Sequence, residues 1–149
     1  MGVTIHYSGT LANPAERQIF LKEAAALAAN FGWRIETDAG SGITILPHAN
    51  SEPLDLIFDE NGTAESWVKT QFAGADTHIQ IVDFLNQIAP YFSSLTIEDE
   101  GEFWETRNPE ILQEHFDRIT AILDEMRQEN PDGRGPLRME NRRIVDFIN

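Results

Sequence analysis

Cysteine is missing from the 149-residue sequence, and basic residues are scarce. Without cysteine the protein has no disulfide bonds, thiolate zinc sites, iron–sulfur clusters or thiol nucleophiles. Only 11 lysines and arginines stand against 25 aspartates and glutamates, which gives a formal net charge of −14. A surface this acidic repels phosphate backbones and anionic lipid headgroups, so we expect binding neither to nucleic acid nor to membranes. Glycine-rich phosphate loops are also missing, and no cofactor is expected.

Long apolar runs are missing as well. No segment approaches the roughly 18 consecutive apolar residues that a membrane-spanning helix needs. The first residues lack the basic stretch followed by an apolar run that marks a signal peptide. The sequence therefore predicts a cytoplasmic protein. Its 41% apolar content suffices to bury one core, and its length favours a single domain.

The charge is unevenly distributed along the chain. Residues 1–106 carry a net charge of −12, whereas residues 107–149 carry only −2, because arginines gather near the C-terminus. Residues 130–136 read Asn-Pro-Asp-Gly-Arg-Gly-Pro, a composition typical of a linker. We therefore predict a single α+β domain over residues 1–130, and a C-terminal linker and docked arm over residues 131–149.

The order of elements follows from hydrophobic periodicity and from turn residues. Short alternating segments predict strands over residues 3–8, 33–36, 42–47, 54–59, 64–72 and 95–98. Helical spacing predicts helices over residues 13–30 and 76–92, and a third that Asn108-Pro109 starts. The pair Asn61-Gly62 is a strong hairpin signal between two of the strands. The resulting order, β-α-β-β-β-β-α-β-α, resembles TATA-binding-protein-like connectivity.

The strands agree on which of their faces is buried. One side of the predicted strands carries Val3, Ile5, Tyr7, Trp33, Ile35, Ile43, Ile45, Leu54, Leu56, Phe58, Val68, Phe72, Leu95 and Ile97. Such alternation predicts one antiparallel sheet of about six strands, with two helices on one face plus a C-terminal helix and tail. The opposite face is polar but includes Leu46, Ile57 and Trp67. We expect the third helix or tail, a second subunit or a ligand to cover these three side chains.

The densest group of acidic residues lies at 98–105. Its carboxylates are of the type that binds calcium or magnesium, but their spacing fits no EF-hand loop. We interpret the segment as a solvated acidic turn with Phe103 and Trp104 packed inward, and we predict no metal site.

A polar cluster on the open face is the candidate site for chemistry. His6, Lys69 and Gln71 share the predicted polar face with Glu36 and Glu98. A histidine beside a carboxylate can act as a general acid or base, although no nucleophile motif is present. We expect His78 and His115 to be structural.

Two segments, residues 68–85 and 95–108, resemble a family of uncharacterised bacterial proteins. The residues that match its pattern are Lys69, Thr70, Gln71, Phe72, Ala73, Gly74, His78, Asp99, Glu100, Gly101, Trp104, Glu105 and Thr106. Glu102 departs from the pattern, where glycine is more common. The resemblance implies no reaction or substrate, but it points to Lys69 and Gln71 beside the acidic turn.

Charge balance suggests partners for the two basic residues near this turn. Lys69 is expected to form an ion pair with Glu98, Glu100 or Glu105, and a salt bridge from Arg107 to the same acidic turn is an equal alternative.

Two functional hypotheses follow. The first is a non-enzymatic interaction or regulatory module that binds a basic protein. The second is a small-molecule binder or enzyme that uses the polar cluster of the open face. A homodimer, formed by exchange of the basic tail, is compatible with both. The candidate binding residues are Trp67, Lys69, Gln71, Glu98, Asp99, Glu100, Trp104 and Glu105.

Overall fold

A computed structural model describes residues 2–38, 40 and 42–149 of the chain. The strands are β1 (Thr4–Leu11), β2 (Arg34–Asp38), β3 (Gly42–Leu46), β4 (Leu54–Ile57), β5 (Thr63–Lys69), β6 (Phe92–Asp99), β7 (Leu137–Arg138) and β8 (Ile144–Val145). The helices are α1 (Arg17–Asn30), α2 (Ala75–Ile88), α3 (Phe103–Thr106) and α4 (Pro109–Glu129), with 3-10 turns η1 (Pro14–Glu16) and η2 (Ala89–Tyr91). The protein is thus a mixed α+β structure, as the sequence predicts.

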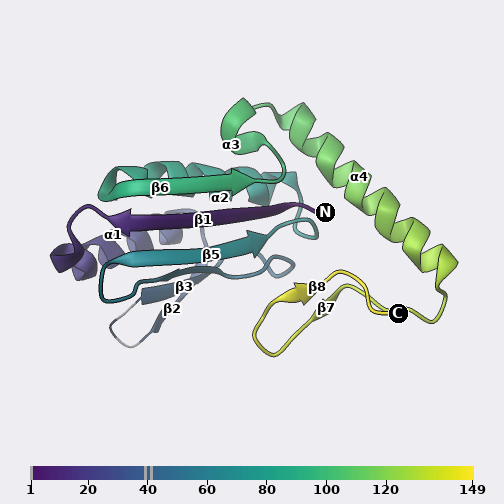
Figure 1. Ribbon diagram of the computed structural model, residues 1–149, viewed down its shortest axis with the longest axis horizontal. Helices are drawn as coiled ribbons and strands as arrows, with labels where there is room; N and C mark the ends of the chain where they lie inside the picture. Colours follow the sequence, from purple (N-terminus) through teal and green to yellow (C-terminus); the bar gives the residue numbers. More distant parts are fainter. Residues whose placement is uncertain (1, 39, 41) are drawn as a thin grey trace.

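Strands β1 to β6 form two antiparallel sheets, with the orders β5-β1-β6 and β2-β3-β4. Helices α1 and α2 lie together behind the strands (Figure 1). The short strands β7 and β8 pair with each other near the C-terminus. None of the helices in the described part of the chain is both long and apolar enough to cross a membrane.

The prediction of one six-stranded sheet is wrong, because the ladder is interrupted between β4 and β5. The Tyr7 hydroxyl accepts a hydrogen bond from the Asp55 amide at 2.9 Å and donates to the Asp55 carbonyl at 2.8 Å. The Tyr7 side chain therefore bonds the backbone groups of β4 that a neighbouring strand would otherwise bond. Burial raises the pKa of Tyr7, so the hydroxyl keeps the proton that it donates.

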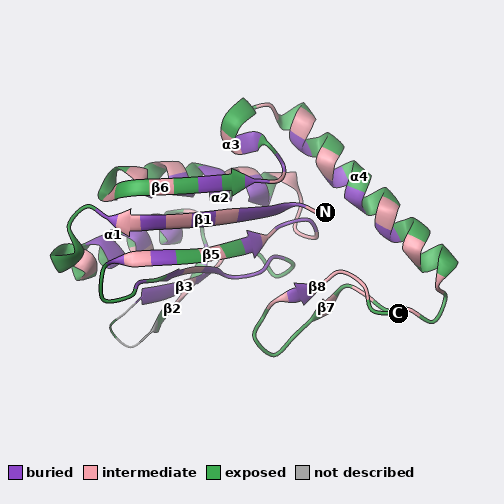
Figure 2. Ribbon diagram, in the orientation of Figure 1, coloured by how far each residue is buried: buried purple, intermediate pink, exposed green. Residues whose placement is uncertain are grey.

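The prediction of a buried and an open sheet face is confirmed. Every residue placed on the apolar side of the strands is buried, except Ile35, Phe72 and Leu95, which are half-buried. Buried and exposed positions alternate along β6 and β5 (Figure 2). The core therefore lies between the sheets and helices α1 and α2, and the other face of β5-β1-β6 is open.

Two details of the predicted helices differ in the structure. Helical spacing predicts Ile19 on the inner side of the first helix, but Ile19 is 57% exposed, because α1 buries Phe20, Leu21 and two alanines. The second helix ends at Ile88 rather than at residue 92, since Pro90 has no N–H to continue it. Strand β6 consequently begins at Phe92 and is longer than predicted.

The C-terminal part begins as predicted and returns to the body. Asn108 caps α4 by accepting a hydrogen bond from the Glu110 amide at 2.9 Å. Helix α4 leads away from the sheets, and the segment after it runs back toward β5 (Figure 1). We call residues 134–148 the arm, because Arg134 and Ile148 bridge its two ends and β7 pairs with β8 between them.

Candidate functional site

The open face of the sheet β5-β1-β6 is a grid of side chains set by strand register. Trp67 on β5, His6 on β1 and Glu98 on β6 stand opposite one another in one row. Glu65, Ser8 and Thr96 form the next row. Ser8 on β1 is short, whereas Trp67 and Glu65 on β5 and Glu98 on β6 are longer, and a trough opens over this part of the sheet.

This trough is a hollow of about 200 Å³. Its lining includes Trp67, which is 45% exposed, together with Glu65 and Glu98. We call the hollow with its Trp67 wall and these two glutamates the acidic trough. An indole beside carboxylates is the environment that favours a guanidinium or ammonium group.

One guanidinium already lies on Trp67. The Arg143 guanidinium carbon is 4.1 Å from the centroid of the Trp67 ring, and its Nη2 donates to the Ser66 hydroxyl at 2.9 Å. The other terminal nitrogen donates to the Trp67 carbonyl and lies 3.3 Å from a Glu52 carboxylate oxygen. The arm thereby covers part of Trp67, whereas Ile57 remains 41% exposed.

A buried carboxylate holds the arm. Glu52 is 2% exposed and accepts hydrogen bonds from the Lys69 amide at 3.0 Å and from the Ile144 amide at 2.8 Å. Beside it the Lys69 ammonium donates to the Ile144 carbonyl and to Asp146, both at 2.7 Å. Body and arm are therefore joined through charged groups, of which Glu52 is buried and the others are partly shielded from water.

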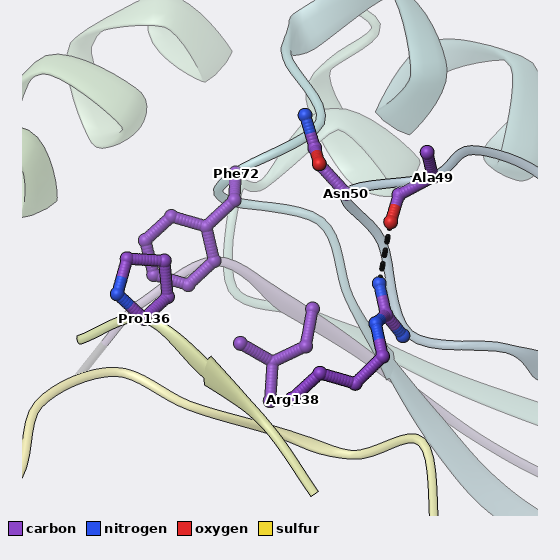
Figure 3. A pocket seen from close by; sticks show the side chains of 6 residues that line it. Ala49, Asn50, Phe72, Pro136 and Arg138 are labelled. Carbon is purple, nitrogen blue, oxygen red and sulfur yellow. Dashed lines mark hydrogen bonds between the residues drawn. The ribbon is translucent and has the colours of Figure 1, made fainter.

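Two further arginines of the arm bind the body at its rim. Arg142 makes a bidentate contact with Glu36 at 2.6 and 3.1 Å, and this hydrogen bonding lowers the pKa of Glu36. Arg138 donates to the carbonyls of Ala49 and Ser51. Between the arm and the body a cavity of about 360 Å³ remains, and Figure 3 shows Arg138 reaching Ala49 across it.

A buried polar network connects the end of β5, helix α2 and the end of β6, and so joins residues 68–85 to residues 95–108. His78 Nδ1 is 2.7 Å from the Thr70 hydroxyl, and Nε2 is 2.9 and 3.0 Å from the two Asp99 carboxylate oxygens. Asp99 also accepts from the amides of Gly101 at 2.8 Å and Trp104 at 2.9 Å. Because a carboxylate only accepts, Nε2 of His78 carries a proton.

The order hydroxyl–imidazole–carboxylate is that of a catalytic triad, but its location argues for a structural role. Thr70 and His78 are 0% exposed, so no substrate atom reaches the hydroxyl. Burial of Asp99 by itself raises the pKa of that carboxyl. The hydrogen bond and charge of His78, with the two backbone amides, outweigh burial and hold the Asp99 pKa below its usual range.

The predicted polar cluster does not assemble as one group. His6 lies next to Glu98 in register, and its Nε2 is 3.7 Å from Glu100. Gln71, however, is buried, and its side-chain oxygen accepts from the Val3 amide at 2.8 Å. The alternation ends at Lys69, because the chain then turns and the Ala73 amide bonds the Thr70 carbonyl.

The expected partners of the two basic residues are also wrong. Lys69 pairs with Asp146 and not with Glu98, Glu100 or Glu105, because β1 separates β5 from the acidic end of β6. Arg107 lies over the rings of Phe103 and Trp104, at 5.9 and 5.4 Å from their centroids, instead of pairing with a carboxylate.

The remaining candidate residues of the acidic turn divide between core and surface. Phe103 is buried and Trp104 is half-buried, whereas Glu105 is exposed. Glu100 accepts from the Thr4 amide at 2.9 Å. Among the residues that the structure describes, no three histidine, aspartate or glutamate side chains gather as a metal site would require.

Glu102 occupies a left-handed conformation, with a φ of 60°. Such a φ costs a residue with a Cβ roughly 1 kcal/mol and favours glycine. The Glu102 carboxylate compensates in part, because it bonds His115 at 2.6 Å on the surface.

Replacing Glu102 separates these two effects. Glu102→Ala and Glu102→Gly both lose the carboxylate, but only glycine relaxes the backbone. We expect the glycine variant to be more stable than the alanine variant by about 1 kcal/mol in urea unfolding. Equal stability of the two variants would show that the left-handed turn is not strained.

Sequence reasoning missed four residues of this region: Glu52, Glu65, Arg143 and Asp146. Glu52 and the arm residues are far apart in the chain, so no periodic pattern connects them. The concentration of arginines after residue 133 of an acidic chain is the signal that could have identified the arm's binding surface.

Comparison of the chain with models of protein families, with curated proteins and with solved structures finds no match. A functional proposal therefore depends on the chemistry of the side chains alone. The acidic trough and the contacts of Arg143 supply that chemistry.

Proposed function

We propose that this protein is a non-enzymatic interaction module that binds a basic segment of a partner protein in the acidic trough. The observation that carries the proposal is the stack of the Arg143 guanidinium on Trp67 at 4.1 Å. It is an example, within the chain itself, of an arginine held by this indole together with neighbouring carboxylates and carbonyls. Glu65 on β5 and Glu98 on β6 line the trough from opposite sides and offer carboxylates to an arginine from another protein.

The overall charge supports the same function. A formal charge of −14 attracts a basic partner over long distances and makes its association fast and dependent on salt. The trough adds specificity, because an aromatic wall and two carboxylates at fixed register positions select cationic side chains at matching positions.

Binding of a fluorescently labelled arginine-rich peptide tests the proposal. We expect the double variant Glu65→Gln/Glu98→Gln to bind the peptide roughly tenfold more weakly than the parent protein, because it loses two charge contacts of about 0.5–1 kcal/mol each. Fluorescence anisotropy at low salt measures the dissociation constants.

The matched control removes the same charge elsewhere. Glu125 and Glu129 are exposed on α4, and the variant Glu125→Gln/Glu129→Gln changes the net charge equally. If both double variants bind the peptide equally well, the acidic trough is not the binding site and only bulk charge acts.

A further inference from the structure

Strand β6 is one edge of the sheet β5-β1-β6, and in the described part of the chain no strand pairs with its outer backbone groups. The Glu100 amide donates to the Thr4 carbonyl, which fixes the alternation of hydrogen bonds between β1 and β6. The peptide groups of Thr96 and Glu98 consequently point toward β1, whereas those of Leu95 and Ile97 point away from it. No backbone bond outside the ladder engages Leu95 or Ile97 among the residues described.

The opposite edge of the same sheet is closed by specific contacts. On β5, the amide and carbonyl of Lys69 bond the side chain and the amide of Glu52, and Arg143 bonds the Trp67 carbonyl. At the other end of β5, Thr63 bonds Asp59 through both its amide and its carbonyl. Comparable contacts are not found along Leu95–Ile97 in the described part of the chain, so the two edges differ.

The β6 edge also lacks the residues that usually prevent strand addition. Its sequence, Phe-Ser-Ser-Leu-Thr-Ile-Glu-Asp, has no proline, lysine or arginine. Figure 1 shows β6 at the rim of the sheet, with α3 beyond its C-terminal end. Ser94, Thr96 and Glu98 are exposed on the open face, and Leu95 and Ile97 face the core.

We propose that the basic segment of the partner binds as an additional β-strand along the outer edge of β6. This inference rests on the proposed function and specifies its geometry. The backbone of the segment pairs with Leu95 and Ile97, and every second side chain lies on the open face beside Thr96 and Glu98. Its basic side chains thereby reach Glu98, which is one wall of the acidic trough.

Charge selects a basic partner strand over a second copy of this chain. Two copies would bring together bodies that each carry −14, and both β6 strands end in the acidic pair Glu98-Asp99. Repulsion of this kind protects an otherwise open edge from self-association. A strand of alternating arginine and threonine satisfies both the backbone groups and the carboxylates.

Amide hydrogen exchange followed residue by residue by NMR tests the proposal. In the free protein, we expect the Leu95 and Ile97 amides to exchange faster than those of Thr96 and Glu98, which bond β1. Addition of a peptide of alternating arginine and threonine should slow exchange at Leu95 and Ile97 by at least about tenfold. The control peptide has the same sequence and charge but carries N-methyl groups on the amides that would face β6.

The outcomes separate this proposal from the proposed function. Slowed exchange with the unmodified peptide, and weaker binding of the methylated one, support strand addition. Equal binding of both peptides without slower exchange overturns strand addition and leaves recognition of a basic segment standing. Binding of neither peptide contradicts both proposals. Slow exchange at Leu95 and Ile97 in the free protein shows that the edge is already covered and also overturns strand addition.

Discussion

Replacing Asp99 by alanine is expected to lower the free energy of unfolding by about 3–5 kcal/mol, because it removes a buried carboxylate and leaves its three donors without an acceptor. The Asp99 side chain is fully buried and is the common acceptor for His78 and for the amides of Gly101 and Trp104. Alanine leaves all three donors without a partner inside the protein. Urea unfolding followed by circular dichroism measures the loss.

Asp99→Asn is the control for shape. Asparagine keeps the volume and one oxygen acceptor, but its amide group meets donors from His78 or from the backbone. We therefore expect a smaller loss than for alanine. If the alanine variant is as stable as the parent, the network of Thr70, His78 and Asp99 contributes nothing to folding, and another role has to explain its geometry.

The pH dependence of stability follows from the same carboxyl. The pKa of Asp99 is lower in the folded protein than in the unfolded chain, so the unfolded state binds the proton more readily. The contribution of Asp99 is full above its unfolded pKa of about 3.9 and is lost as the pH falls through the lower folded value. Between about pH 5 and pH 2 the parent should thus lose stability more steeply than Asp99→Asn.

Several parts of the fold could be predicted from local sequence because their causes are local. Alternation placed Ile5 and Val68 in the core. The chain also turns at Asn61-Gly62, with Gly62 at a φ of 78°, although the strands before and after the turn, β4 and β5, belong to different sheets. The Asn108 cap is likewise a contact between neighbours in the chain. No local pattern indicates that the strands form two sheets instead of one. Tyr7 fits the apolar pattern of its strand, but its hydroxyl bonds the backbone of Asp55, 48 residues later in the chain.

The candidate site could be predicted only in part, because some of its contacts join residues that are far apart in the sequence. Trp67 and Glu98 follow from alternation, and strand register brings them to the same row. Gln71 was misplaced because a strand pattern does not reveal where the chain turns. Buried acidic residues are rare, so the sequence alone indicates that Glu52 lies on the surface. Its partner Ile144 belongs to the arm, 92 residues later in the chain, and no local pattern connects the two.

Replacing Glu52 by alanine is expected to release the arm and to lower the free energy of unfolding by about 3 kcal/mol, because charged hydrogen bonds of a buried carboxylate are lost. Its carboxylate bonds the amides of Lys69 and Ile144 and lies 3.3 Å from Arg143. Without it, those two amides face an apolar methyl group. Urea unfolding measures the stability, and limited proteolysis measures release of the arm as faster cleavage within residues 131–149.

Glu36→Gln is the matched control, since it also removes one carboxylate that binds an arginine of the arm. The Glu36–Arg142 pair is exposed to water, so its loss should change stability little and leave the arm resistant to protease. The comparison of the two variants shows whether a carboxylate must be buried to hold the arm on the body, or whether any carboxylate that binds an arginine of the arm suffices. If Glu52→Ala lowers stability while cleavage of the arm stays slow, Glu52 supports the body alone, and the contacts of Lys69 with Ile144 and Asp146 suffice to hold the arm.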